Sequence, residues 1–356
     1  MRMRTAVFAW AKYSPIRFFE QAQYMRLLRA GSALLIHQRF LAMGTEVSVR
    51  LICTDSSQRD DALCAIQAVI NLMHEFGRDA WAWGDGALSA FNRTLAAGEA
   101  AQIPANLQGL FARAWQVRQQ TDGLFEPRIA QLVHLWGFDD VARLRDSPPS
   151  QHEIDVLLSA LHAAPDYKGA GRYGPAPGVA WDFGGIGKGH IVDMALDLLR
   201  ERGFGNAIVN AGGNLAVRGA HHARPWRAAV RDPRSPEGAL RLLASLDVRD
   251  EAVITHGDDQ RYFEHEGLRY AHILSPDTGA PVQGLRSLTV VHTDATLADA
   301  GGAALFVAGI DDWQAVAKIL SIDQVLVVRE DGRVQATATL AARLSPSPDV
   351  VIETLT

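Results

Sequence analysis

Strand and helix patterns follow one another along this chain without strict alternation, and this mixture is the feature that most constrains its fold. Around residues 179–213 a short strand, VAWDF, is expected to lead through a glycine-rich turn into the helix KGHIVDMALDLLRER and the buried strand NAIVNAGG. Between Trp226 and Val291 apolar residues instead alternate with polar ones between turn signals, which predicts several antiparallel strands. The combination favours an α+β fold over a doubly wound parallel sheet.

Other segments have equally regular patterns. EVSVRLIC, from Thr45, alternates as a strand does, and DDALCAIQAVINLMHEF and NLQGLFARAWQVRQQTDG have apolar residues at helical spacing. The segment AWAWGDGALSAFNR between them is expected to be a loop. Near the end of the chain, TLADAGGAALFVAG and WQAVAKIL predict two helices, and VLVVRE and VQATA predict a hairpin that turns at Asp331 and Gly332.

Composition excludes several classes of protein. Apolar residues make up 48% of the 356 residues and charged residues 21%, as in ordinary globular proteins. A net charge of −5 provides no basic surface for nucleic acid, so no nucleic-acid partner is expected. Two cysteines define neither a disulfide framework nor a zinc site. No apolar run reaches the ~18 residues that a transmembrane helix needs.

The stretch DFGGIGKGHIVD, residues 182–193, resembles three nucleotide motifs but has the spacing of none. A P-loop requires a glycine where Asp182 stands and a Ser or Thr where Gly189 stands. A dinucleotide-binding turn requires G-x-G-x-x-G, whereas these glycines are two residues apart. A kinase would require an H-R-D loop upstream, which the chain lacks.

General physics still makes this stretch a candidate phosphate site. Glycines let the backbone approach a ligand closely, a helix N-terminus attracts anions, and Lys188 adds a positive charge. Asp182 could accept a hydrogen bond from a ligand or could cap the turn. On this stretch alone, a strand-to-helix turn with a solvated lysine is an equally good interpretation.

Six motifs in order decide between these interpretations. Besides DFGGIGKGHIVD, the chain contains FLAMGTEVSV (40–49), LFEPRIAQLVHLWGFD (124–139), IVNAGGNLAVRG (208–219), ITHGDDQRYFEHEGLRYAHILSPDTGAPV (254–282) and TLADAGGAALFVAG (296–309). Together they resemble the ApbE family of FAD:protein FMN transferases, from about Phe40 to the C-terminus. The resemblance implies one domain over residues 40–356, with a mixed, largely antiparallel sheet flanked by helices. Residues 1–39 would be an N-terminal extension, and residues 141–177 a peripheral excursion.

The resemblance also implies a reaction. Members of the family cleave FAD, transfer its FMN moiety to a Thr or Ser hydroxyl of a target flavoprotein and release AMP. FAD is thus a substrate, Mg²⁺ assists, and the partner is a target flavoprotein. Phosphoryl transfer requires neutralisation of negative charge and a base for the hydroxyl. A cytoplasmic location is the default expectation, with a periplasmic or membrane-associated one, as in many family members, left open.

The motifs carry candidate site residues. The residues implied to contact FAD are Met43, Trp81 or Trp83, Leu124, Phe125, Glu126, Asp182, Lys188 and Ile273. The candidate base is His272, which could alternatively only pin the SPDTG turn through hydrogen bonds. The implied metal ligands are the Gly185 and Gly302 carbonyl groups, the Asp299 carboxylate and the residue at position 303.

The chain departs from the family pattern at the metal. Ala303 stands where the family has a threonine hydroxyl, so weaker Mg²⁺ binding is expected, with water filling the vacancy. Paired glycines beside it are expected to loosen the turn that presents Asp299. Glu126 replaces the usual Asp, and Arg128 a Thr. His256 replaces a Ser and could be a nitrogen ligand or a second base.

These departures leave two alternatives to the transferase open. One is an FAD-binding homologue with impaired catalysis. The other is a slow FAD pyrophosphatase that uses water as the acceptor.

Overall fold

The computed structural model of the protein describes residues 24–30, 33–140, 143–169, 171–221, 224–235 and 241–355, so residues 1–23 of the expected extension lie outside it. The α-helices are α1 (Arg59–Asp79), α2 (Ala87–Ala96), α3 (Gln108–Gln120), α4 (Ala130–Leu135), α5 (Gln151–Ala163), α6 (Gly187–Glu201), α7 (Ala295–Ile319) and α8 (Ala338–Ala341). The strands are β1 (Tyr24–Ala30), β2 (Ala33–Ala42), β3 (Thr45–Cys53), β4 (Ala101–Gln102), β5 (Arg172–Tyr173), β6 (Ala207–Ala211), β7 (Asn214–Arg218), β8 (Trp226–Arg231), β9 (Leu242–Val248), β10 (Ala252–Gly257), β11 (Tyr262–His265), β12 (Leu268–Ala271), β13 (Leu285–His292), β14 (Val325–Arg329), β15 (Val334–Thr337), β16 (Ser345–Pro346) and β17 (Ile352–Leu355).

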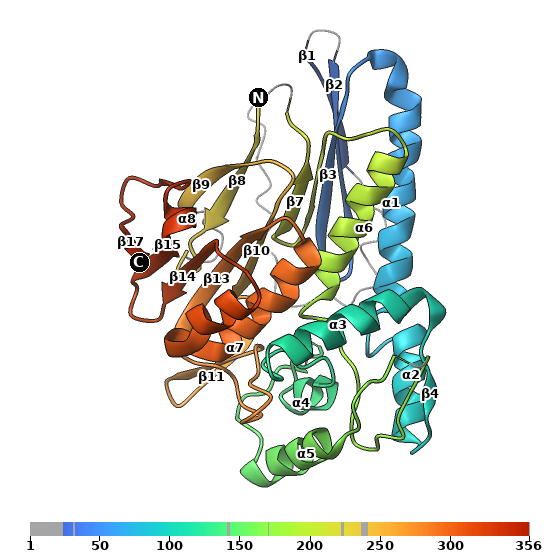
Figure 1. Ribbon diagram of the computed structural model, residues 1–356, viewed down its shortest axis with the longest axis vertical. Coiled ribbons are helices and arrows are strands. Elements are labelled where there is room, and N and C mark those ends of the chain that lie inside the picture. Colours follow the sequence, from blue (N-terminus) through green and yellow to red (C-terminus); the bar gives the residue numbers. More distant parts are fainter. Residues whose placement is uncertain are drawn as a thin grey trace, which may run out of the picture.

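A ten-stranded sheet organises the molecule (Figure 1). Its strand order is β1-β2-β3-β6-β7-β10-β13-β14-β15-β17, and the described pairs are antiparallel except for the parallel pair β15 and β17. Helices α1, α6 and α7 cover one face, and the three-stranded sheet β16-β9-β8 packs on the other. The expectation of an α+β fold with a largely antiparallel sheet and flanking helices is confirmed.

Period-two patterns explain why the sheet is covered on both faces. In β14, Val325 and Val327 belong to the core under the helices, whereas Leu326 and Val328 belong to the core under the three-stranded sheet. Successive side chains of a strand point to opposite faces, so a strand buried on both sides has a continuous apolar sequence. The sequence VLVV meets that requirement.

The covering helices present apolar faces at helical spacing. In α6, Ile191, Ala195 and Leu199 are fully buried, and Val192 and Leu196 lie beside them. These positions recur every three or four residues and therefore share one side of the helix. The two helices expected near the C-terminus form α7, which is broken at Gly309, where φ is 74° and ψ is −171°.

The N-terminal part of the sheet begins before the motifs do. β2 pairs with β3 from Leu34 to Ala42, so the boundary expected between residues 39 and 40 falls inside a strand of the main sheet. Ile36 and Phe40 on this strand are buried in the core under the helices. The first described residues thus add β1 and β2 to one sheet edge.

The excursion at residues 141–177 contains α5 and packs on a small separate core. Its buried members include Trp136, Phe138, Ile154 and Phe263. The Trp136 indole Nε1 donates a hydrogen bond to the Gly279 carbonyl at 2.7 Å. This core joins α4 and α5 to the β11–β12 hairpin at the end of the molecule shown lowest in Figure 1.

Two local expectations were wrong. VAWDF forms no strand, only a single bridge between Ala180 and Ile129, because the Asn92 side chain takes both backbone groups of Trp181, with each hydrogen bond 2.8 Å long. The second half of AWAWGDGALSAFNR is not a loop but the start of α2, whose Leu88 and Phe91 are buried in the core. Long-range packing overrides the local pattern at both places.

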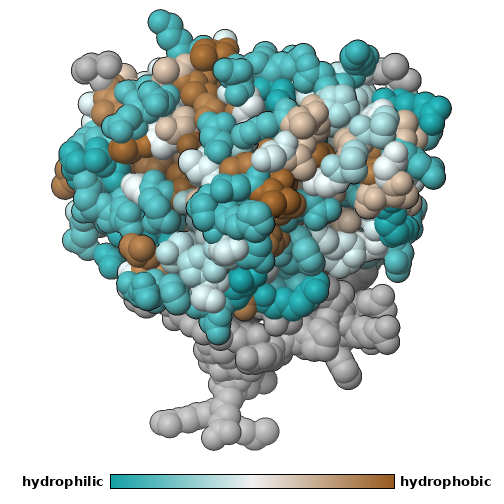
Figure 2. Space-filling view, turned by 90° about the horizontal axis from the view of Figure 1, so that it is seen from below, coloured by the Kyte–Doolittle hydropathy of each residue, from teal (hydrophilic) through white to brown (hydrophobic). Residues whose placement is uncertain are grey.

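Seen from below in Figure 2, hydrophilic residues predominate and hydrophobic residues form separate patches. Apolar residues of this kind are normal on the surface of globular proteins. None of the described helices combines the length and apolar composition needed to cross a bilayer.

A close approach of α6 and α7 yields a stability prediction. A Cβ atom at Gly189 would lie 2.1 Å from the Ala295 carbonyl oxygen and 2.7 Å from Asp299 Cβ. Gly189→Ala should therefore lower the free energy of unfolding by about 1–3 kcal/mol through overpacking. Gly109→Ala, in α3, should raise it by about 0.5–1 kcal/mol because space is open there and alanine favours helix. Equal midpoints of urea unfolding for the two variants would contradict this packing.

Candidate active site

The glycine-rich turn at residues 182–189 is held by its own backbone and by a buried aromatic cluster. The Asp182 backbone N–H donates to the Pro127 carbonyl at 2.8 Å, and the Gly184 N–H donates to Asp182 Oδ1 at 3.1 Å. Trp181 and Phe183 on either side are buried. Burial raises the pKa of Asp182, and the Gly184 N–H and the charges of Arg261 and Lys188 oppose that shift. Asp182 therefore caps the turn and faces two cations.

The start of α6 is joined to α7 by Asp299. The Gly189 N–H donates to Asp299 Oδ2 at 2.8 Å, and the side chain of Asp299 is only 1% exposed. Its other oxygen, Oδ1, is buried and has no hydrogen-bond partner. A carboxylate oxygen left unsatisfied at this depth is costly, which marks Oδ1 as an acceptor that a bound ligand would complete.

His256, on β10, approaches that unsatisfied oxygen. Its Nε2 is buried without a hydrogen-bond partner and lies 3.7 Å from Asp299 Oδ1. Burial lowers the pKa of His256, while the charge of Asp299 acts in the opposite direction and that of Lys188 lowers the pKa further. The imidazole and the carboxylate thus face each other at a distance too long for a hydrogen bond.

His272 follows β12 and presents a second unpartnered imidazole. Its backbone N–H donates to the Arg261 carbonyl at 3.1 Å, which fixes the backbone, while Nδ1 is buried without a partner. Burial and the charges of Arg261 and Lys188 lower the pKa of His272 to about 3. The imidazole is therefore neutral near neutral pH.

The low pKa of His272 has a consequence for stability. Between pH about 3 and 6.5 the unfolded chain binds a proton at this residue that the folded chain does not bind. Stability contributed by the neutral imidazole is therefore lost as pH falls below 6.5. From pH 7 to pH 5, the free energy of unfolding of the wild type should fall by more than that of His272→Gln. The difference between the two decreases, measured by urea unfolding, should be at most about 2 kcal/mol. Identical losses would contradict the lowered pKa.

The implied metal ligands supply few side-chain oxygens. A Cβ at Gly185 would lie 3.6 Å from the Ala303 Cβ and 3.3 Å from the Phe125 ring, so the turn and α7 are in contact. Ala303 offers no oxygen, which leaves Asp299 Oδ1 as the unsatisfied side-chain oxygen. Among the described residues, no group of three or more His, Cys, Asp or Glu side chains could hold a metal ion.

The expectation that Gly301 and Gly302 loosen the turn that presents Asp299 was wrong. Gly301 and Gly302 lie inside α7, which begins at Ala295. A Cβ at Gly301 would lie 2.7 Å from Ile322 Cδ1, and one at Gly302 would lie 2.6 Å from two atoms of the His256 ring. Neighbouring side chains thus occupy the space that both glycines leave.

Glu126 lies in a buried ion-pair network. Its Oε1 accepts hydrogen bonds from the Arg128 backbone N–H and Nε, and its Oε2 accepts from Arg128 Nη2 at 2.8 Å and Arg118 Nε at 2.6 Å. Burial raises the pKa of Glu126, but the bonds and charges of Arg128 and Arg118 outweigh it and lower that pKa. Arg128 Nη1 also donates to the Pro165 carbonyl and the Tyr173 hydroxyl group. The carboxylate is thus fully used within the protein.

The remaining candidates are distributed around the turn. Met43 has a φ of 52° in the turn between β2 and β3, and its Cγ would lie 2.9 Å from a Cβ at Gly77. Trp81 is 44% exposed over Gly84, whereas Trp83 is partly buried against the main core. The candidates that also pack in this core are Leu124, Phe125 and Ile273.

Sequence reasoning missed Arg261. Its charge acts on both Asp182 and His272, and its Nη1 donates to the Phe138 carbonyl at 3.1 Å. The one signal available was its place within the GDDQRYFEHEG part of a family motif. Without coordinates, nothing distinguishes it from a solvated arginine.

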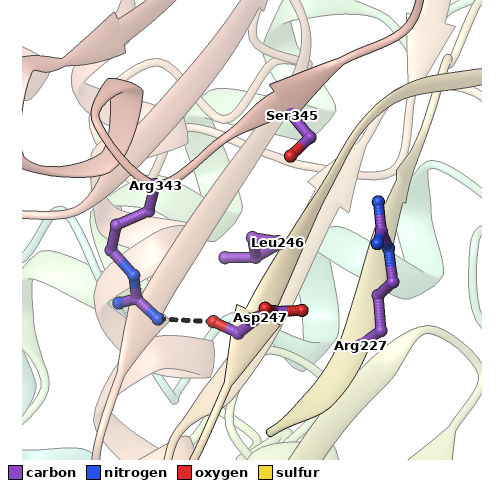
Figure 3. Close-up of a pocket in the computed structure, with 5 residues that line it drawn as sticks. All are labelled: Arg227, Leu246, Asp247, Arg343 and Ser345. Atoms are coloured by element: carbon purple, nitrogen blue, oxygen red, sulfur yellow. Dashed lines mark hydrogen bonds between the residues drawn. The ribbon is translucent and has the colours of Figure 1, made fainter.

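A polar hollow lies away from these residues. Figure 3 shows Arg227, Leu246, Asp247, Arg343 and Ser345 around a space of about 240 Å³ beside the three-stranded sheet. Arg343 there is already paired with the Glu251 carboxylate through two hydrogen bonds of 2.7 Å. The site residues gather instead where the first turns of α6 and α7 meet β10 and the segment after β12.

Comparison with known proteins identifies the family of this chain. The model of the ApbE family matches residues 43–326. A Rhodobacter capsulatus protein named FAD:protein FMN transferase is 32% identical over 331 residues, covering 89% of this chain and 61% of that relative. The crystal structure of the ApbE protein of Thermotoga maritima superimposes with a TM-score of 0.77 and 29% identity, covering 87% of this chain and 99% of that one. The structure of flavin transferase ApbE from Vibrio cholerae superimposes with a TM-score of 0.74 and 25% identity, again covering 87% of this chain and 99% of that one.

These matches place the protein in a class. The glycine-rich turn and the carboxylate that joins α6 to α7 lie within the matched region. The chain belongs to the ApbE family.

Proposed function

We propose that this protein is an FAD:protein FMN transferase, which transfers the FMN moiety of FAD to a Thr or Ser hydroxyl of a target flavoprotein and releases AMP. The proposal depends chiefly on one observation: the junction of α6 and α7 gathers Lys188, the unsatisfied Asp299 Oδ1 and the unpartnered His272. The names of the curated relatives support the same activity.

The positive side of the site suits a pyrophosphate. Lys188 lies in the first turn of α6, where the helix dipole favours an anion. Its charge also influences His256 and His272, so a phosphate held by Lys188 would lie near both imidazoles. Lys188 would bind the FAD phosphates and neutralise charge that develops during transfer.

The bond changes assign a role to His272. The hydroxyl oxygen of the target attacks the phosphorus atom of the FMN half, and the bond from that phosphorus to the bridging oxygen breaks. The bond's electron pair leaves with AMP, and the hydroxyl proton passes to the imidazole of His272. A bound pyrophosphate would offset the charges of Arg261 and Lys188, and so raise the pKa of His272 toward the range useful for a general base.

The residues present also fit a divalent cation. The buried, unsatisfied Asp299 Oδ1 would hold it together with the Gly185 and Gly302 carbonyl oxygens. Mg²⁺ at such a position supplies charge neutralisation on the phosphoryl group.

The flavin half of FAD would lie beside Met43 and Trp81 or Trp83, and the nucleotide would contact Asp182, Ile273 and residues 124–126. Because the Glu126 carboxylate is used by Arg118 and Arg128, its contribution would come through the backbone it holds in place. The charges of Lys188 and Arg261 act on Asp182, which would contact the nucleotide from the turn.

Ala303 favours a second candidate, an FAD-binding homologue with impaired catalysis, because it removes a metal-binding oxygen. The FAD pyrophosphatase alternative differs from both candidates in its acceptor, which is water. Product analysis separates the three: flavinylated target with AMP supports the transferase, FMN with AMP and no need for a target supports the pyrophosphatase, and bound but uncleaved FAD supports the binding homologue.

The transferase should depend on Lys188 and His272. With FAD, Mg²⁺ or Mn²⁺ and a target flavoprotein domain, in-gel fluorescence should show covalent flavin on the target. Lys188→Ala should slow transfer by about 10²–10³-fold, and His272→Gln by about 10²–10⁴-fold. Lys318→Ala, an exposed lysine in the last turn of α7, is the matched control and should transfer at the wild-type rate. Transfer that is equally fast in all four proteins would contradict the proposal.

A further inference from the structure

Two positions around Asp299 depart from the family pattern. Position 303 has lost the hydroxyl oxygen that the family pattern places there, and position 256 has gained an imidazole in place of a serine. Ala303 is on α7 and His256 is on β10, so the two positions are on different elements of the fold. Both lie next to residues already implicated in the site, since Ala303 faces Gly185 and His256 faces Asp299.

The imidazole of His256 occupies the space that the missing side chain of Gly302 leaves. A Cβ atom at Gly302 would lie 2.6 Å from both Cδ2 and Nε2 of His256, a distance that no real Cβ contact tolerates. Any residue other than glycine at position 302 would therefore displace the ring. The missing side chain at 302 and the large ring at 256 are complementary, which fixes Nε2 beside Asp299.

Two unsatisfied polar atoms face each other in this space. His256 Nε2 and Asp299 Oδ1 are both buried, their side chains are 12% and 1% exposed, and neither atom has a hydrogen-bond partner. A buried polar atom that nothing satisfies is destabilising. A separation of 3.7 Å is too long for a direct hydrogen bond between them.

A cation that accepts an electron pair from both atoms would satisfy them together. Two ligands that each lie about 2.1 Å from one metal ion are about 3.0–3.6 Å apart at ligand–metal–ligand angles of about 90–120°. The observed 3.7 Å lies next to that range. Oxygen ligands alone suit Mg²⁺, whereas an added imidazole favours first-row transition metals.

We propose that His256 is a metal ligand through Nε2, together with Asp299, and that this nitrogen makes the site selective for a first-row transition-metal dication over Mg²⁺. The cation's catalytic role rests on the proposed transferase function, but its binding does not. The Nε2 atom of His256, on β10, thereby compensates for the oxygen that is missing at Ala303, on α7.

Metal binding can be measured without FAD or a target. The probe is Mn²⁺, added to the metal-free full chain, with electron spin echo modulation to detect ¹⁴N coupled to the manganese. Mn²⁺ and Mg²⁺ affinities come from equilibrium dialysis with each metal alone. The variants are His256→Ser and the matched control His265→Ser, which removes a histidine on β11 whose ring contacts Asp146 and Glu266.

The wild type and His265→Ser should show ¹⁴N coupling, and His256→Ser should lose it. His256→Ser should also bind Mn²⁺ at least about tenfold more weakly while Mg²⁺ affinity changes much less. The double variant His256→Ser with Ala303→Thr should regain an oxygen ligand and shift the preference toward Mg²⁺. Wild-type protein that binds Mn²⁺ without ¹⁴N coupling, or an unchanged Mn²⁺/Mg²⁺ ratio in a folded His256→Ser variant, would overturn the assignment.

The metal-binding experiment and the transfer assay test separate proposals, so either proposal can be contradicted without the other. Nitrogen-coupled Mn²⁺ in a protein that transfers no FMN would contradict the proposed function and leave His256 as a ligand. Transfer of FMN by a protein whose bound Mn²⁺ shows no ¹⁴N coupling would support the proposed function and contradict the assignment of His256 as a ligand.

Discussion

The contact between the first turn of α6 and the body of α7 is the constraint on which the site depends. Gly189 has no side chain, so the two helices approach until its N–H reaches Asp299 Oδ2 at 2.8 Å. One carboxylate oxygen is thereby fixed, and the other is left buried and unsatisfied beside His256. The same approach sets the first turn of α6, and with it Lys188, next to the carboxylate. A single helix contact thus places the N-terminus of α6 next to an unsatisfied carboxylate oxygen.

Much of the fold follows from the sequence because its causes are local. Period-two and period-3.6 patterns identified β3, β6, α1 and α6, and glycine at 309 ended one helix where the pattern predicted it. VAWDF was misassigned because an amide side chain, Asn92, takes the hydrogen bonds that a strand would have used. The start of α2 was missed because glycine and tryptophan before it suggested a continuous loop. In both cases a distant partner decides the local structure.

The candidate site was predicted as a set of residues but not as a set of contacts. Family motifs pointed to Lys188, His272 and Asp299; in the structure the charge of Lys188 acts on His272, and Asp299 accepts a hydrogen bond from Gly189, the residue after Lys188. They could not show that Glu126 and Arg128, two departures from the family pattern, are partners in one buried ion pair. Nor could they show that Gly302 makes room for the ring of His256, since these residues are far apart in the chain. Such pairs are visible only when packing distances are known.

The central claim is that the junction of α6 and α7 binds FAD through its pyrophosphate. A crystal structure of the full chain with FAD tests it most directly. The account predicts phosphate oxygens within hydrogen-bonding distance of Lys188 Nζ, with His272 facing the phosphorus of the FMN half. FAD bound at a different place, such as the hollow beside Arg227 and Arg343 shown in Figure 3, would contradict it.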